Sequence, residues 1–250
     1  MVEEFELTLK VFGTPAEEGG GGKIIMLERN AFAGVHGAIM VHRAPIDARQ
    51  MYPLARARFR VCYKGKAAHA SMFPYEGRNA ADAMVVNQVA LGLLRQHLNN
   101  ASDLDSLLRR VYDCFEAAAK ATGTTAEIGE TAPRYTEFLP NEQMLVSYVR
   151  NAAALGRSSS ESQLSQLGGS TDMGDISQAM PAIHPLIGIG SFPAVNHQPE
   201  FAATCVLPCA DSAVVDGAVA MAWTILDLAR DQDARLRLTT GKRVPACLDT

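Results

Sequence analysis

The chain has 250 residues, of which 48% are apolar and 20% charged, and its formal net charge is −4. This composition predicts a globular protein of one large or two smaller domains, without the basic surface that attracts nucleic acid or acidic lipid. No apolar run reaches the length of about 20 residues that spans a bilayer. Residues 1–10 lack a secretory pattern and the cysteines are scattered, so we expect a cytoplasmic protein.

Two adjacent carboxylates follow the first predicted strand. Residues 5–11 alternate apolar and polar side chains, which is typical of a half-buried strand, and a Gly-Thr-Pro sequence ends it. Glu17 and Glu18 come next, followed by four glycines that allow close approach of the backbone. Residues 23–33 predict a helix, and residues 38–42 predict a short buried strand that ends in a histidine. Ligands gather at the carboxyl ends of strands in α/β sheets, so this region is a candidate catalytic site.

A different pattern occupies the middle of the chain. Polar and apolar residues alternate over residues 56–63, as in a strand with one solvent-exposed face, and a loop containing His69 follows. Asn79 is suited to cap the next helix. The remaining elements expected here are helices over 80–98 and 103–122 and a strand over 124–128. This order of strand, helix, helix and strand predicts an inserted domain over residues 54–139.

The C-terminal part returns to an α/β pattern. Its expected elements are a helix over 141–155, a loop over 157–170, a short helix after Asp172, a strand over 183–189, a loop carrying His197, an apolar helix over 211–229 and a frayed polar tail. Residues 1–53 and 140–250 are therefore predicted to form one discontinuous α/β domain around the insertion.

The residues themselves suggest metal-dependent hydrolysis. A turn at a strand end can aim Glu17 and Glu18 into one cleft, where one binds a metal ion and the other takes a proton from metal-bound water. Two solvated loop acids are the alternative interpretation. His42 and His197 are natural companions, since imidazole is the commonest ligand for zinc-like ions. Each is also compatible with a purely structural role.

Other polar residues support weaker predictions. His69 could donate to a developing oxyanion, although a surface histidine is the simpler interpretation. Asp172 is either a helix N-cap or a carboxylate that orients a metal-bound histidine. His36 and His184 are weaker ligand candidates. The glycine run is not a phosphate loop, because Lys23 is not followed by Ser or Thr.

Six stretches occur in the order found in a known enzyme family. They are residues 13–23 (GTPAEEGGGGK), 41–45 (VHRAP), 65–70 (GKAAHA), 78–83 (RNAADA), 170–175 (STDMGD) and 196–201 (NHQPEF). Together they resemble the M20 family of metal-dependent amidohydrolases and peptidases. The resemblance is greatest to the branch with the aminobenzoyl-glutamate hydrolase subunits and the dipeptidase-like M20 domain-containing protein 2, and it spans nearly the whole chain.

This resemblance implies a zinc-exopeptidase-like α/β catalytic domain with an inserted α+β dimerisation domain. It implies hydrolysis of an amide bond in an N-acyl amino acid or small dipeptide, with up to two divalent ions: zinc, with manganese or cobalt as alternatives. It implies a homodimer through the inserted domain. The residue roles that it implies are Glu17 as general base, Glu18, His42 and His197 as metal ligands, His69 as a contact to the substrate carboxylate or oxyanion from a partner subunit, Asn79 as support for that loop, and Asp172 beside the C-terminal ligand.

Two departures from the family pattern affect these expectations. No His-x-Asp or Cys-x-His ligand segment precedes residue 13, so we expect the N-terminal part of the catalytic domain to be missing. Only residues 99–102 join the two central helices, so we expect the inserted domain to be shortened by two strands. The chain is therefore predicted to be a weak or inactive hydrolase. The alternatives are a non-catalytic protein of this fold that acts as a binding or dimerisation partner, and, disfavoured, a nucleotide-binding α/β protein.

Overall fold

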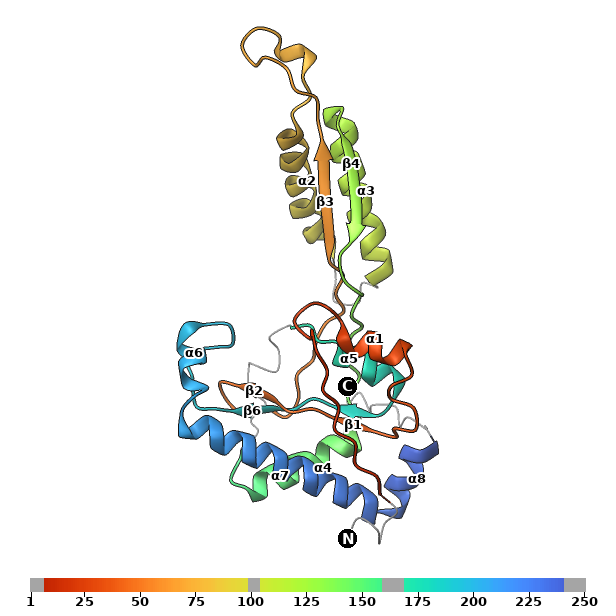
Figure 1. The fold of residues 1–250 in the computed structure, drawn as a ribbon, viewed down its shortest axis with the longest axis vertical. Coiled ribbons are helices and arrows are strands. Elements are labelled where there is room, and N and C mark those ends of the chain that lie inside the picture. Colours follow the sequence, from red (N-terminus) through yellow and green to blue (C-terminus); the bar gives the residue numbers. More distant parts are fainter. Residues whose placement is uncertain (1–6, 99–103, 159–168, 241–250) are drawn as a thin grey trace. The chain divides into compact units, whose positions relative to one another are not determined.

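The structure is a computed structural model that describes residues 7–98, 104–158 and 169–240. The chain divides into two compact units, one of residues 1–55 and 135–250 and one of residues 56–134 (Figure 1). These boundaries lie close to the predicted domains, 1–53 with 140–250 and 54–139. The catalytic and dimerisation roles given to the domains stay predictions.

The first unit is an α/β structure with helices on both sides of short parallel strands (Figure 1). Strand β1 (Ala38–Ile39) pairs in parallel with β5 (Ala182–Ile183), and β2 (His42–Ala44) pairs in parallel with β6 (Leu186–Gly188). The helices are α1 (Gly22–Glu28), α4 (Glu142–Ala154), α5 (Met173–Ala179), α6 (Pro199–Thr204), α7 (Pro208–Arg230) and α8 (Gln232–Thr240). Helices α4 and α7 lie on one side of the strands, and α1 and α5 lie on the other. This arrangement confirms a mixed helix and sheet fold.

Alternating side chains of the strands build a core on each face. Ile39 and Ile183 pack against the cluster contributed by α4 and α7. Their neighbours Ala38 and Ala182 pack against the cluster contributed by α1 and α5. Successive side chains of a strand point to opposite faces, so a strand covered by helices on both sides is apolar throughout. This is why the strands read as short continuous apolar runs.

The parallel strands are shorter than predicted. The expected strands over residues 38–42 and 183–189 are each split in two. Pro185 has no N–H to donate and interrupts the second of them, while its carbonyl accepts the N–H of His42 at 3.0 Å. His42 therefore begins β2, whereas the sequence predicted that it would end a strand.

The predicted first strand is wrong for the part of it that the structure describes. Residues 7–11 form no strand, and Leu9 and Val11 are 63% and 92% exposed. The chain is held instead by Phe12, whose ring centroid lies 4.6 Å from that of Phe32.

Helix α1 ends at Glu28, five residues before the predicted end, and Asn30 just beyond it has a positive φ of 59°. A left-handed residue cannot continue a right-handed helix.

The second unit has the predicted order of strand, helix, helix and strand. Strands β3 (Phe59–Lys64) and β4 (Thr125–Glu130) form an antiparallel pair. The helices α2 (Ala80–Leu94) and α3 (Leu104–Thr122) pack against each other. Two short 3₁₀ turns, η2 (Pro74–Glu76) and η3 (Arg95–His97), complete the described elements. Asn79 caps α2 as predicted, because its Oδ1 accepts the N–H of Ala81 at 3.1 Å.

The packing face of α2 differs from the predicted one. The helical spacing of apolar residues predicts a stripe of Met84, Val85, Val89, Leu91, Leu94 and Leu98. Leu94 is buried as predicted, but Met84, Val85 and Val89 are 40–59% exposed. The helix packs through the smaller Ala83 and through Leu94, which are 0% and 8% exposed. An apolar face of α2 is thus left uncovered in the chain by itself.

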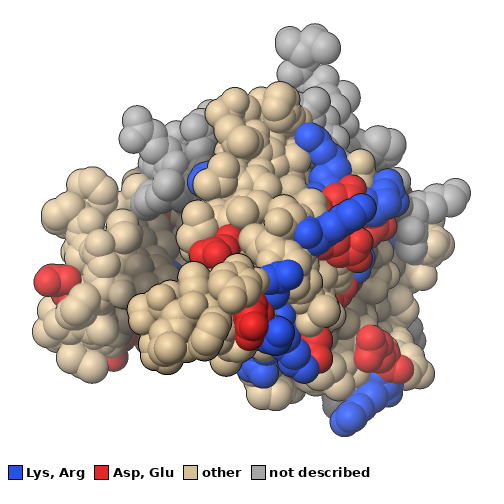
Figure 2. All heavy atoms as spheres, turned by 90° about the horizontal axis from the view of Figure 1, so that it is seen from above, with Lys and Arg blue, Asp and Glu red and all other residues tan. Residues whose placement is uncertain are grey.

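Helix α7 is long and apolar enough, among the described helices, to meet a length and composition test for a membrane span. It packs along α4, where Asp227 accepts hydrogen bonds from Arg150 and Asn151 at 2.9 and 2.8 Å. This packing covers only part of the apolar surface of α7, since Val214 and Val215 are 73% and 60% exposed, and the test establishes no span. Acidic and basic side chains are interspersed on the face shown in Figure 2.

Candidate functional site

The Glu17–Glu18 pair lies in a tight turn that leads into α1. The carbonyl of Ala16 accepts the N–H groups of both Gly20 and Gly21, at 2.8 and 3.1 Å. Gly21 has a φ of 64°, and a Cβ on Gly22 would lie 1.9 Å from a backbone oxygen. These two positions therefore need glycine, one for its φ and one for the close approach of the backbone. The turn leaves Glu17 half-buried and Glu18 exposed.

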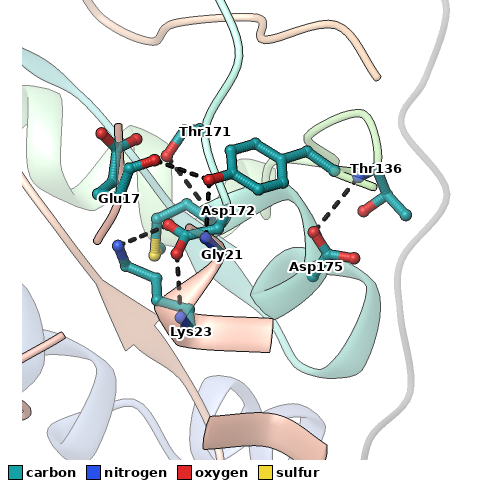
Figure 3. A network of polar contacts seen from close by, with 9 residues as sticks. Glu17, Gly21, Lys23, Thr136, Thr171, Asp172 and Asp175 are labelled. Carbon is teal, nitrogen blue, oxygen red and sulfur yellow. Dashed lines mark hydrogen bonds and ion pairs between the residues drawn. The ribbon is translucent and has the colours of Figure 1, made fainter. Parts of the chain in front are cut away.

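Tyr135 fastens this turn to the unit. Its buried hydroxyl donates to the carbonyl of Glu17 at 2.8 Å and accepts the N–H of Gly21 at 3.0 Å (Figure 3). Both bonds go to the backbone, so they leave the carboxylate of Glu17 outside this contact. Sequence reasoning missed Tyr135, because no local pattern connects it with residues more than a hundred positions earlier.

A buried ion pair fastens the next residues. The ammonium group of Lys23 lies 2.7 Å from Oδ1 of Asp172, and the backbone N–H of Lys23 donates to Oδ2 at 3.0 Å. The two side chains are 3% and 0% exposed. Figure 3 shows them pointing toward each other. Asp172 occupies the N-cap position of α5 but makes no capping bond; the hydroxyl of Thr171 accepts the N–H of Met173 instead. Asp172 thus holds Lys23 at the start of α1, directly after the turn, whereas the sequence left open a helix N-cap or a carboxylate that orients a histidine.

The segments of His42 and His197 meet at one carbonyl. The oxygen of Arg43 accepts a hydrogen bond from Nδ1 of His42 at 2.6 Å and another from the amide of Asn196 at 3.1 Å. Donation from Nδ1 leaves Nε2 of His42 as the nitrogen with a lone pair. His197 is exposed and has a φ of 70°, a conformation rare for a residue with a side chain. The structure therefore brings two of the three predicted ligand segments together.

His184 lies beside His42 in the interior. It is fully buried, and neither ring nitrogen has a hydrogen-bond partner among the described residues. Its ring centroid lies 5.8 Å from that of His42. Burial, and then the charges of His42 and Lys23, lower the pKa of His184 to about 3. The sequence ranked this histidine low, although a polar residue inside an apolar strand run was a usable signal.

The remaining predicted residues make contacts within the second unit. His69 and Asn79 belong to the second unit, where both are exposed. Nδ1 of His69 accepts the N–H of Met72 at 3.3 Å, and the amide of Asn79 donates to Asp82 at 2.8 Å. Their predicted roles toward a substrate stay predictions.

Asp175 is a further carboxylate in this region. Oδ2 of Asp175 accepts the N–H of Thr136 at 3.3 Å (Figure 3). Burial raises the pKa of Asp175, and the hydrogen bonds from Thr136 oppose this rise. Thr136 directly follows Tyr135, so two consecutive residues of one segment contact the Glu17–Glu18 turn and helix α5.

Comparison with known proteins shows what this arrangement is related to. Xaa-Arg dipeptidase of Mus musculus is 33% identical over 252 residues, covering 87% of this chain, and the human protein of that name matches equally. The chain is a homologue of Xaa-Arg dipeptidase. One of the subunits of the p-aminobenzoyl-glutamate hydrolase of Escherichia coli is 34% identical over 92 residues, which are 36% of this chain and 19% of that protein. No family model matches the chain.

Solved structures agree on the fold of this homologue. An aminobenzoyl-glutamate utilization protein from Klebsiella pneumoniae superposes with a TM-score of 0.58 at 18% identity, covering 86% of this chain and 59% of its own. A dinuclear metal-binding peptidase of the M20 family from Bacillus subtilis gives 0.59 at 16% identity, covering 87% and 64%. At the level of the fold, these structures agree with the resemblance to the M20 peptidases and amidohydrolases. The chain spans 58% of the length of the dipeptidases that it matches.

The metal binding named for the Bacillus subtilis peptidase can be tested against the residues described here. Glu18, His42 and His197 have the carboxylate and imidazole donors that a zinc-like ion prefers. Among residues 7–98, 104–158 and 169–240, however, no three His, Cys, Asp or Glu side chains are grouped closely enough to hold an ion. The described residues therefore do not form a metal site as they stand, and we assign no chemical step to a metal.

Proposed function

We propose that the chain carries the catalytic turn of an M20-type hydrolase that cleaves an amide bond in small dipeptides or N-acyl amino acids. The observation that carries this proposal is the anchoring of the Glu17–Glu18 turn. Tyr135 and Asp172 bind its backbone from the interior, while the Glu17 carboxylate stays outside these contacts. A fixed main chain with a free carboxylate is the arrangement that general-base catalysis needs. Homology to dipeptidases supports the same reaction class.

In the proposed reaction, Glu17 carries out both proton transfers. Its carboxylate takes a proton from a water molecule as the water oxygen bonds to the amide carbon. The carboxylic acid then gives this proton to the amide nitrogen as the carbon–nitrogen bond breaks, and an acid and an amine leave. We propose Glu18, His42 and His197 as ligands of a divalent ion, zinc with manganese or cobalt as alternatives, when one binds. We propose that His69, supported by Asn79, contacts the substrate carboxylate or the oxyanion.

We also propose a cytoplasmic homodimer that pairs through the second unit. The uncovered apolar face of α2 supports this proposal, because Met84, Val85 and Val89 are large apolar side chains exposed side by side on one helix. A second copy of the chain is the proposed occupant of this face.

The test compares two Glu→Gln variants of the full chain on a panel of dipeptides and N-acyl amino acids, with arginine-containing dipeptides included. Glu17→Gln is expected to lower kcat by about 10²–10⁴-fold, the usual contribution of a general base. Glu28→Gln, at the exposed end of α1, is the matched control and should leave kcat unchanged.

Metal content per chain, measured by elemental analysis after dialysis, accompanies this comparison. One or two ions per chain, lost in Glu18→Gln, support the proposed ligands. Hydrolysis by wild-type chain that survives Glu17→Gln refutes the role of Glu17. Absence of both hydrolysis and bound metal refutes the enzyme and favours a non-catalytic partner of the same fold.

A further inference from the structure

Tyr135 occupies an unusual place in the first unit, because one hydroxyl binds both ends of the turn that carries Glu17. It donates to the Glu17 carbonyl and accepts the Gly21 N–H, at 2.8 and 3.0 Å. The side chain is 0% exposed. Hydrogen bonds in such a water-poor environment are stronger than exposed ones, and a partner that loses them is not easily satisfied by solvent.

The turn needs such support because its own conformation is disfavoured. Ala16 has a φ of 60°, which places its Cβ close to a carbonyl oxygen. The turn compensates with the two hydrogen bonds to the Ala16 carbonyl, and both of these reach glycines on the far side of Glu17 and Glu18. Glu17 lies between Ala16 and these glycines. Its carbonyl accepts a hydrogen bond from the hydroxyl of Tyr135, which ties it to the interior.

We propose that Tyr135 is a positioning residue for Glu17: its hydroxyl fixes the backbone of the turn and thereby the place of the carboxylate. This inference rests on the proposed role of Glu17 as general base. The two hydrogen bonds of its hydroxyl described above go to the backbone of Glu17 and Gly21, so we expect it to act through the position of Glu17. A shift of a catalytic group by about 1 Å costs on the order of 10²-fold in rate.

The test removes the hydroxyl and keeps the ring. Tyr135→Phe is compared with Tyr148→Phe, a matched control on α4 in the same unit that is also buried, at 3% exposure, and lies in the opposite core cluster. Two quantities are measured on the full chain: hydrogen exchange of the backbone amides in residues 16–23, and kcat and KM for a dipeptide substrate.

We expect exchange of the amides in residues 16–23 to become up to about 10-fold faster in Tyr135→Phe, although the N–H of Gly21 keeps its second hydrogen bond, to the Ala16 carbonyl. Exchange in α4 and α7 should stay at the wild-type rate, which separates a local effect from general loosening. The value of kcat should fall by about 10–10²-fold, with KM within a factor of about two. Tyr148→Phe should leave kcat, KM and exchange in the turn unchanged.

Unchanged exchange in residues 16–23 overturns the inference, whatever happens to activity. So does faster exchange with an unaltered kcat, or a change confined to KM, which would indicate a role in substrate binding. If wild-type chain hydrolyses no substrate, the proposed function fails, and the exchange measurement still decides whether Tyr135 holds the turn.

Discussion

Replacing Lys23 by methionine would leave the carboxylate of Asp172 buried without its ion-pair partner. Methionine has nearly the length of the lysine stem and adds no charge, so the substitution removes the ammonium group with little loss of packing. The backbone N–H of residue 23 would still donate to Asp172, and the fold of α1 would be retained. The variant therefore isolates the charge.

The magnitude follows from the geometry of the pair. At 2.7 Å the two charges attract each other by about 6 kcal/mol for an effective dielectric constant near 20. Burial costs several kcal/mol per ion, so the intact pair contributes little relative to an apolar pair of the same size. Removing one partner leaves the other charge uncompensated, which costs about 3–5 kcal/mol. The double variant Lys23→Met with Asp172→Asn removes both charges and keeps an oxygen acceptor for the backbone N–H of residue 23. It should therefore recover most of this loss.

Urea unfolding followed by fluorescence measures the effect. The single tryptophan of the chain, Trp223, lies on α7 in the same unit as the pair, so its signal reports the relevant part of the protein. With a slope of about 1–3 kcal/mol per molar urea, the single variant should lower the midpoint by at least about 1 M. If the single variant does not fold but the double variant does, this result would also support the reasoning. A single variant within about 1 kcal/mol of wild type, or a double variant as unstable as the single one, would refute the reasoning.

Two further predictions concern the same unit. Burial lowers the pKa of His184 to about 3 in the folded chain, whereas it is about 6.5 in the unfolded chain. Below pH 6.5 the unfolded chain therefore binds a proton that the folded chain does not, so the free energy of unfolding decreases as the pH is lowered. Between pH 7 and pH 5 this group should remove about 2 kcal/mol, and urea unfolding of His184→Phe should show a correspondingly smaller acid loss; equal losses would contradict the assignment. Gly22→Ala should destabilise the unit by at least about 1–3 kcal/mol in the same assay, because its Cβ would meet a backbone oxygen at 1.9 Å. Gly13→Ala, in the same unit and at a position where nothing lies within 4 Å, is its control and should change stability by no more than about 0.5 kcal/mol.

The elements that the sequence predicted well are those with local physical causes. Helix α3 ends where expected because Gly123 takes a positive φ of 67°, and α4 begins after Asn141, whose Oδ1 accepts the N–H of Met144. The first predicted strand failed for the opposite reason. Alternation in residues 7–11 is a local pattern, but a strand needs a neighbour to pair with, and Leu9 and Val11 have none among the described residues.

The sequence by itself determined the α/β pattern, the order of elements in the second unit, the glycine-rich turn with its two carboxylates, and the resemblance to the M20 hydrolases. All of these are written in neighbouring residues, through period, propensity and motif. Only the tertiary structure decided what holds the turn. Tyr135 and Asp172 reach it across sequence separations of 118 and 149 residues. Such contacts depend on which faces the two core clusters bring together, and no local pattern encodes them.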